Sequence, residues 1–224
     1  CACGSPAGGR GVWLAGGWGV GRRRVSVLGG GVAGLCAARV AAGMGADVTV
    51  FDVDVARMRY IDEVWGGRIG TRFSSPLAVR EACGESDVVI GSVLVPGART
   101  PHLVDHEMVL GMVPGSVLVD VAVDQGGCFE DSHPTTHADP TFVVGGSVFY
   151  CVANMPGAVP HTSTYALTNA TMRYVLLLAD EGWRGACGSR DDLRRGLATC
   201  GGKLVSAPVG EALGIECVPV SEVL

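Results

Sequence analysis

The stretch at 25–52 limits the possible folds more than any other part of the chain. A short apolar run with β-branched residues precedes glycines at G-x-G-x-x-G spacing, an alanine-rich segment follows, and a second apolar run ends on Asp52. Strand, glycine turn, helix, strand and acid follow one another in this order in a dinucleotide-binding βαβ unit. The stretch therefore predicts a Rossmann-type nucleotide-binding domain.

The three glycines of the turn have separate tasks in this interpretation. Gly29 allows the tight turn, Gly31 lets a pyrophosphate approach the backbone, and Gly34 lets the helix lie close to the strand. Val32, within the turn, is a further candidate cofactor contact. The helix is predicted at 36–44, and the free N–H groups at its start then face the phosphates, where the helix dipole favours negative charge. The alternative is a sharp strand-to-helix turn without a ligand, which the complete βαβ context disfavours.

The acid at the end of the second strand indicates the kind of dinucleotide. Asp52 stands about 20 residues beyond the turn, where an acid binds the ribose hydroxyls. Its charge would repel a 2′-phosphate, so the sequence predicts NAD rather than NADP as the cofactor. Arg57, one helical turn further on, could soften that preference or could be a solvated helix charge; the sequence leaves both open.

Strands and helices continue to alternate after this unit, which is typical of a parallel, doubly wound α/β sheet. The pattern indicates helices at 54–64, 76–83 and 103–111. It indicates strands at 68–73, 87–90 and 116–119, of which the last runs on to Asp124, and an exit loop at 91–97. Apolar runs at 141–144 and 148–150 complete the sheet.

The sequence pattern changes near residue 160. A long helical pattern at 162–180 begins there, and a shorter one at 189–197 follows. No further βαβ unit fits there. We therefore expect a lead-in segment at 1–24, a nucleotide-binding domain at 25–160, and at 161–224 a helical part of a second domain. Because the chain starts at Cys1 and nothing of domain size precedes residue 25, we expect a C-terminal portion of a longer protein.

Three polar residues follow predicted strand ends or lie in loops near them. Ser74 could contact the adenosine end of the cofactor, or Ser74 or Ser75 could cap the next helix. Asp124, before a flexible Gln-Gly-Gly, could reach the nicotinamide and the substrate, although a turn-forming aspartate fits the spacing better. Asn154 could bond the nicotinamide carboxamide or a ribose hydroxyl, or it could cap a loop.

Composition excludes several other functions. A net charge of −5 argues against a nucleic-acid partner. The nine cysteines are scattered without a C-x-x-C pair, so we expect neither a zinc site nor a disulfide framework, and a reducing cytoplasm. No apolar run is long enough to span a bilayer. His102 and His106 are predicted to lie on a helix surface, and His133 and His137 in a solvated loop; no metal site is predicted.

Several stretches beyond the glycine turn resemble bacterial alanine dehydrogenases over nearly the whole chain. These are GGRGVWLAGG, VLGGGVAG, ARVAAGMGADVTVFD, DVVIGSVLVPGA, VDVAVDQGGCFE, FYCVANMPGAVPHTSTYALTNAT and LADEGW. DQGGCFE and CVANMP with TSTYALTNAT are specific, and they separate the chain from the related transhydrogenase α subunit. The resemblance implies reversible oxidative deamination of L-alanine to pyruvate and ammonia with NAD, in a homo-oligomer, a hexamer.

The resemblance also implies roles for individual residues. Asp124 matches the catalytic aspartate of the family, Asp52 the ribose-binding acid, and Arg57 and Ser74 adenosine contacts. The loops that line the cofactor correspond to Val93 and Leu94, to Val121, Ala122, Val123 and Asp124, and to Val152, Ala153, Asn154 and Met155.

Some positions depart from the family pattern. His133 stands where the family often has an arginine that touches the cofactor, and Leu177 and Glu181 stand where some members hold a metal. The first half of the family's two-domain protein, which supplies substrate residues, has no counterpart here. We therefore expect the chain to be inactive alone; the alternative is a non-catalytic NAD-binding module or a subunit of transhydrogenase type.

Overall fold

A computed structural model describes residues 2–95 and 100–224 of the chain. The described residues separate into two compact units, residues 2–94 with 100–154, and residues 155–224 with Val95. The first unit holds a seven-stranded sheet, and the second is mainly helical. The domain boundaries at residues 24 and 160 stay a prediction, and Pro96 and Gly97 of the predicted exit loop lie outside the described residues.

The sheet of the first unit confirms the doubly wound α/β prediction. Its strand order is β3-β2-β1-β4-β5-β7-β6, and every neighbouring pair is parallel except β6 with β7. The strands are β1 Arg24–Leu28, β2 Asp47–Asp52, β3 Gly70–Phe73, β4 Val88–Gly91, β5 Val117–Asp120, β6 Thr141–Val144 and β7 Ser147–Tyr150.

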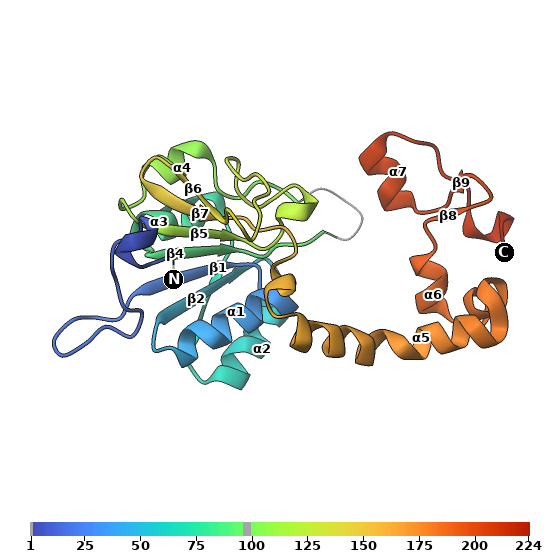
Figure 1. Ribbon diagram of the computed structural model, residues 1–224, viewed down its shortest axis with the longest axis horizontal. Helices are drawn as coiled ribbons and strands as arrows, with labels where there is room; N and C mark the ends of the chain where they lie inside the picture. Colours follow the sequence, from blue (N-terminus) through green and yellow to red (C-terminus); the bar gives the residue numbers. More distant parts are fainter. Residues whose placement is uncertain (1, 96–99) are drawn as a thin grey trace. The chain divides into compact units, whose positions relative to one another are not determined.

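Helices cover both faces of this sheet. The helices α1 (Val32–Gly43) and α2 (Val55–Trp65) lie on one face, and α3 (Pro76–Glu85) and α4 (His106–Leu110) lie on the other (Figure 1). Successive strand residues point to opposite faces, so β1 contributes Val25 and Val27 to the core beneath α1 and Leu28 to the core beneath α3. The α3 face is the one with the aromatic residues Phe129 and Phe149, which meet edge to face.

Two elements begin or end elsewhere than the sequence predicts. The fifth strand ends at Asp120 and does not run on to Asp124, because the Asp120 carboxylate bonds the N–H of Ala122 and turns the chain. The helix predicted at 103–111 begins only at His106, because Asp105 caps it by accepting from the N–H of Met108. His102 therefore lies outside the helix, and the prediction of a His102–His106 pair on one helix surface is wrong.

The second unit contains the long helix predicted from the sequence. Helix α5 (Pro160–Ser189) is interrupted at Gly182, whose φ of 68° and ψ of 167° are not helical. The other elements are η3 (Met155–Ala158), α6 (Asp191–Gly196), a hairpin of β8 (Thr199–Cys200) and β9 (Lys203–Leu204), α7 (Ala207–Leu213) and η4 (Val220–Glu222). None of the described helices combines the length and apolar content needed to cross a membrane.

The lead-in segment is tied to the sheet through an ion pair. The guanidinium of Arg10 donates to the Asp87 carboxylate at 2.6 Å, and the side chain of Asp87 is only 7% exposed. Asp87 also accepts from the backbone N–H of Arg24, at the start of β1. A single buried carboxylate thus joins the lead-in, β1 and the start of β4.

We expect Arg10→Ala to lower the free energy of unfolding by roughly 2–3 kcal/mol, because it leaves the buried Asp87 charge without its cation. The figure is below that of a fully buried pair, since Arg10 is partly exposed. Urea denaturation measures the loss, and Arg22→Ala, at an exposed arginine of the same segment, is the matched control. Equal stability of the two variants would contradict the role given to the ion pair.

Candidate functional site

The glycine turn after β1 brings the strand end and the start of α1 into close contact. Gly29 has a φ of 98°, and its N–H donates to the carbonyl of Phe51 at 2.8 Å. A Cβ at Gly34 would lie 1.9 Å from the Gly29 carbonyl oxygen, a distance that no side chain can occupy. A Cβ at Gly31 would meet nothing within 4 Å, so the backbone is open to a ligand there.

The amino end of α1 differs from those of α2, α3 and α4, the other α-helices in the described part of this unit. Carboxylates of Asp54 and Asp105 and the hydroxyl of Ser75 cap α2, α4 and α3, whereas no side chain caps α1. The first N–H groups of a helix have no partners within it, and the helix dipole makes this end attractive to anions. The turn therefore offers an anion the combination of open space and N–H donors that the sequence predicts.

Asp52 and Arg57 are both fastened to the peptide groups of Gly30. Asp52 Oδ2 accepts from the Gly30 N–H at 2.6 Å, and its Oδ1 accepts from the Asp54 N–H at 2.9 Å. Arg57 Nε donates to the Gly30 carbonyl, so Arg57 is not the solvated helix charge that the sequence left open. A Cβ at Gly30 would lie 3.0 Å from Asp52 Oδ2. Gly30 thus sets the place of the carboxylate, a role that the G-x-G-x-x-G pattern does not indicate.

The structure decides which serine caps α3. Ser75 Oγ accepts from the Ala78 N–H at 3.2 Å, and Pro76 opens the helix. Ser74 directly follows Phe73, the register partner of Asp52, and its N–H donates to the Asp52 carbonyl at 2.9 Å. Its contact with adenosine stays a prediction, and the capping alternative now belongs to Ser75.

The end of β4 supports the turn from the neighbouring strand. Ser92 is 8% exposed, and its hydroxyl donates to the carbonyls of Leu28 and Gly29 at 2.9 and 3.0 Å. A Cβ on Gly29 would lie 3.0 Å from Val93 Cγ2. Val93 therefore packs against the turn, while Leu94 is 56% exposed; the cofactor contacts of both stay predictions. Ser92 was not among the predicted site residues.

The end of β5 carries a buried carboxylate that the sequence interpretation also passed over. Asp120 is fully buried, and it accepts hydrogen bonds from the N–H groups of Ala122, Cys128 and Phe129 and from the Ser132 hydroxyl. These bonds close the loop of residues 121–132. Only its position after an apolar strand and before Gln-Gly-Gly could have signalled this role in the sequence.

Asp124 and Asn154 lie next to one another, and their contacts with a cofactor stay predictions. Asp124 is exposed in the 3-10 helix η2 (Val123–Gln125), and its Oδ2 accepts a long bond of 3.5 Å from the Asn154 N–H. Asn154 has a φ of 57°, a left-handed conformation that asparagine tolerates better than most residues. Its carbonyl also lies 3.1 Å from His137 Nε2. The Asp124 carboxylate is exposed and can be reached by a ligand. An aspartate that only forms a turn would not need this exposure.

The other predicted cofactor contacts differ in what they can offer. Val121 is 38% exposed, whereas the side chains of Ala122, Val123 and Val152 are almost completely buried. The buried residues could reach a cofactor only through backbone groups. Ala153 donates its N–H to the Thr135 carbonyl, and Met155 opens η3 in the second unit.

The histidines take different places. His133 stacks on Phe142 with ring centroids 3.7 Å apart, so one ring face is covered although the residue is exposed. The imidazole of His106 bonds the carboxylate of Asp131, which raises the pKa of His106. Among the described residues, no three His, Cys, Asp or Glu side chains gather in a way that could hold a metal.

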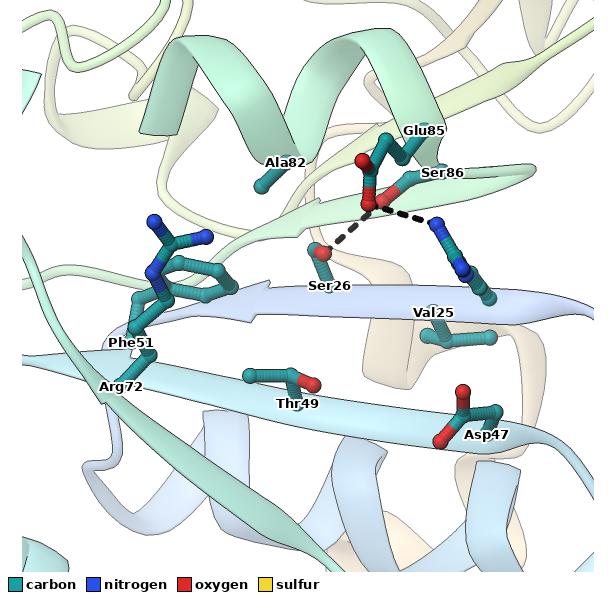
Figure 2. A pocket seen from close by; sticks show the side chains of 10 residues that line it. Val25, Ser26, Asp47, Thr49, Phe51, Arg72, Ala82, Glu85 and Ser86 are labelled. Atoms are coloured by element: carbon teal, nitrogen blue, oxygen red, sulfur yellow. Dashed lines mark hydrogen bonds and ion pairs between the residues drawn. The ribbon is translucent and has the colours of Figure 1, made fainter. Parts of the chain in front are cut away.

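A polar recess of about 240 Å³ lies between α3 and the strands β1 and β2, and it starts at their amino ends (Figure 2). Arg24 at its rim pairs with Glu85, and the buried hydroxyls of Ser26 and Ser86 bond one another at 2.8 Å. These four groups thus satisfy one another in pairs. Ligands of open α/β sheets bind at the carboxyl ends of the strands, so the turn is the better candidate site.

Sheet order, crossovers and the glycine turn place the chain in the Rossmann class of α/β domains. The family model described as alanine dehydrogenase/PNT, C-terminal domain, matches residues 2–207, and the chain belongs to this family. The sequence prediction of that family is confirmed.

Individual relatives agree with this assignment. The chain is 57% identical to an alanine dehydrogenase of Mycolicibacterium smegmatis and 49% identical to one of Bacillus subtilis, over 97% and 98% of its length. In both comparisons it spans 58% of the relative's own length. A solved L-alanine dehydrogenase superposes with a TM-score of 0.85 at 46% identity, covering 95% of this chain and 59% of the other. A transhydrogenase from Sinorhizobium meliloti is less similar, with a TM-score of 0.58 at 30% identity over 65% of this chain and 42% of its own.

We expect buried thiols beside the site to make stability fall in alkaline solution. Burial raises the pKa of Cys128 to about 12 and that of Cys151 to about 11, and the charge of Asp120 adds to both. An unfolded chain releases such protons near pH 9, so the folded state loses its advantage as the pH rises above that value.

Urea denaturation between pH 7.5 and pH 10 measures this effect. Each thiol should lower the free energy of unfolding by up to about 1.4 kcal/mol per pH unit above its unfolded pKa. Cys128→Ala should show a shallower decline than the wild type, and Cys36→Ala, at an exposed cysteine, should not. A stability that does not change over this range would contradict the expectation.

Proposed function

We propose that this chain is the NAD-binding portion of an alanine dehydrogenase, which converts L-alanine reversibly to pyruvate and ammonia. The observation that carries the proposal is the uncapped amino end of α1, with open space at Gly31 and the Asp52 carboxylate beside the turn. The names of the relatives supply the reaction.

NAD, when bound, supplies the acceptor for the hydride of the α-carbon. The chain's own residues would bind and orient it. The N–H groups at Gly31 and Val32 would hold the pyrophosphate, and Asp52 would bond the adenosine ribose. Arg57 is held near Asp52 by its bond to the Gly30 carbonyl, and the N–H of Ser74 donates to the Asp52 carbonyl. Both contacts support an adenosine role for these two residues.

Asp124 is the residue we propose to act at the reacting end. Its carboxylate is exposed at the edge where the strands end, and one oxygen faces the Asn154 N–H. An exposed carboxylate can take up or release a proton at a substrate amine or orient a cationic partner. Asn154 would keep the carboxylate in place and present its own amide to the cofactor.

We also propose that residues 161–224 belong to a second domain that requires further sequence to form its core. Their buried residues are few, namely Ala186, Cys187, Val205 and Gly210, and Tyr165, Leu167, Val175 and Leu176 of α5 are exposed. Uncovered apolar side chains of this kind support packing against a further domain or against other subunits of a hexamer. The eight cysteines of the described residues form no disulfide, which supports a cytoplasmic location.

A chimera tests the proposed reaction. The part of the Mycolicibacterium smegmatis enzyme that precedes the matching region is placed ahead of this chain, and NADH absorbance is followed after addition of NAD and L-alanine. We expect turnover by the chimera and none by the chain alone. NAD binding by both proteins without turnover in the chimera would favour a non-catalytic module.

Asp124→Asn in the active chimera should lower kcat by at least about 100-fold, the range for loss of an acid–base group. NAD affinity, measured by calorimetry, should remain unchanged. Asp139→Asn, at an exposed aspartate of a nearby loop, is the control. Wild-type turnover in Asp124→Asn would leave this residue as a loop aspartate without a part in the reaction.

Asp52→Ala should weaken NAD binding by about 1–3 kcal/mol, because it leaves polar partners without their bonds. Calorimetry on this chain measures the change. Asp47→Ala, at the opposite end of the same strand, should bind NAD like the wild type. Equal affinities of the two variants would remove the ribose assignment of Asp52.

A further inference from the structure

We propose that Asp120 is a positioning residue of the site: its buried carboxylate fastens the loop of residues 121–132 and thereby holds Val121–Asp124 in place for cofactor and substrate. The inference rests on the proposed function, because it gives a task to the loop that carries Asp124. Asp120 itself is fully buried, so it would act through the loop.

The hydrogen bonds of Asp120 reach both ends of the loop. Its Oδ1 accepts from the Ala122 N–H at 3.0 Å, and its Oδ2 accepts from the Ser132 hydroxyl at 2.6 Å. Oδ2 also accepts from the N–H groups of Cys128 and Phe129, at 2.8 and 3.4 Å. All four groups donate, so an ionised carboxylate satisfies every one of them, and bonds to a charged acceptor are the stronger kind.

Backbone bonds also hold this loop, since the N–H groups of Thr100 and Leu103 donate to the carbonyls of Gln125 and Cys128. Gly126 and Gly127 have φ values of 102° and 79°, and a Cβ on Gly127 would lie 2.9 Å from Asp120 Oδ2. The backbone of Gly127 therefore lies directly against the carboxylate. Glycines give a loop the most conformational freedom to lose, so the bonds of Asp120 act together with these backbone bonds to fix one path.

The same loop also connects Asp120 to the glycine turn through a chain of contacts. Cys128, whose N–H is held by Asp120, packs on Gly91 so closely that a Cβ there would lie 2.6 Å from the Cys128 Cβ. The Cys128 thiol donates to the Val93 carbonyl at 3.8 Å, and Val93 packs against Gly29. Asp120 thus supports both the segment that carries Asp124 and the residue that backs the turn.

The test compares Asp120→Asn with Asp87→Asn. Both are buried carboxylates of the sheet unit, but Asp87 lies at the start of β4 and bonds the lead-in segment. The amide keeps the shape of the carboxylate and turns an NH2 group toward at least one N–H donor. Hydrogen exchange of residues 121–132 and calorimetry with NAD are measured on the chain, and kcat and KM are measured in the chimera.

We expect Asp120→Asn to speed the exchange of the loop amides, to weaken NAD binding about ten-fold, the equivalent of one charged hydrogen bond, and to lower kcat. Asp87→Asn should lower the unfolding midpoint without changing NAD affinity or kcat. The inference is overturned if Asp120→Asn exchanges its loop amides and binds NAD like the wild type, or if both variants weaken NAD equally.

Ser132→Ala is the second variant, since it removes one of the four bonds and keeps the carboxylate. It should give a smaller change of the same kind, and it keeps the inference testable if Asp120→Asn does not fold. Should the wild-type chain not bind NAD, the proposed function fails, and loop exchange alone then decides whether Asp120 fastens the loop.

Discussion

The contact between the backbones of Gly29 and Gly34 is the constraint on which the site depends. Because residue 34 has no Cβ, the Gly29 carbonyl can lie directly against α1, and the helix can start just after the end of β1. That start leaves the first N–H groups of α1 without a capping side chain. Ser92, at the end of the neighbouring strand β4, donates its hydroxyl to the carbonyls of Leu28 and Gly29 and so stabilises the turn.

The sheet could be predicted from the sequence because its buried strands are apolar runs separated by glycines and by helical segments. The strand ends were harder to predict, since they depend on single polar side chains. Asp105 and Asp120 each bond a backbone N–H two or three residues further on, and these bonds start α4 and end β5. An aspartate in an apolar run can equally continue a strand, so the pattern alone could not place either boundary. The antiparallel direction of β6 follows from its tight connection to β7 through Gly145 and Gly146.

The candidate site shows the same division between local pattern and contacts across the chain. The spacing of Gly29, Gly31, Gly34 and Asp52 is a property of one continuous stretch, and the structure brings the four together. Gly30 and Ser92 act through partners 22 to 64 residues away, and their tasks cannot be recognised without the fold. Arg57 belongs to both groups: its helical position was visible in the sequence, whereas its bond to the Gly30 carbonyl was not.

The two buried carboxylates of the sheet unit differ in how their charge is balanced. Asp87, at the amino ends of the strands, has the cation Arg10 beside it, whereas the partners of Asp120 at the carboxyl ends are neutral N–H and hydroxyl groups. Neutral donors stabilise a carboxylate without cancelling its charge, so the field of Asp120 persists around its loop. Asp124 adds to this negative region, and the uncapped end of α1 supplies a positive one. The oxidised dinucleotide that we propose as the cofactor carries anionic phosphates and a cationic nicotinamide ring, and an edge with both signs of charge would suit these two parts better than a uniformly charged surface.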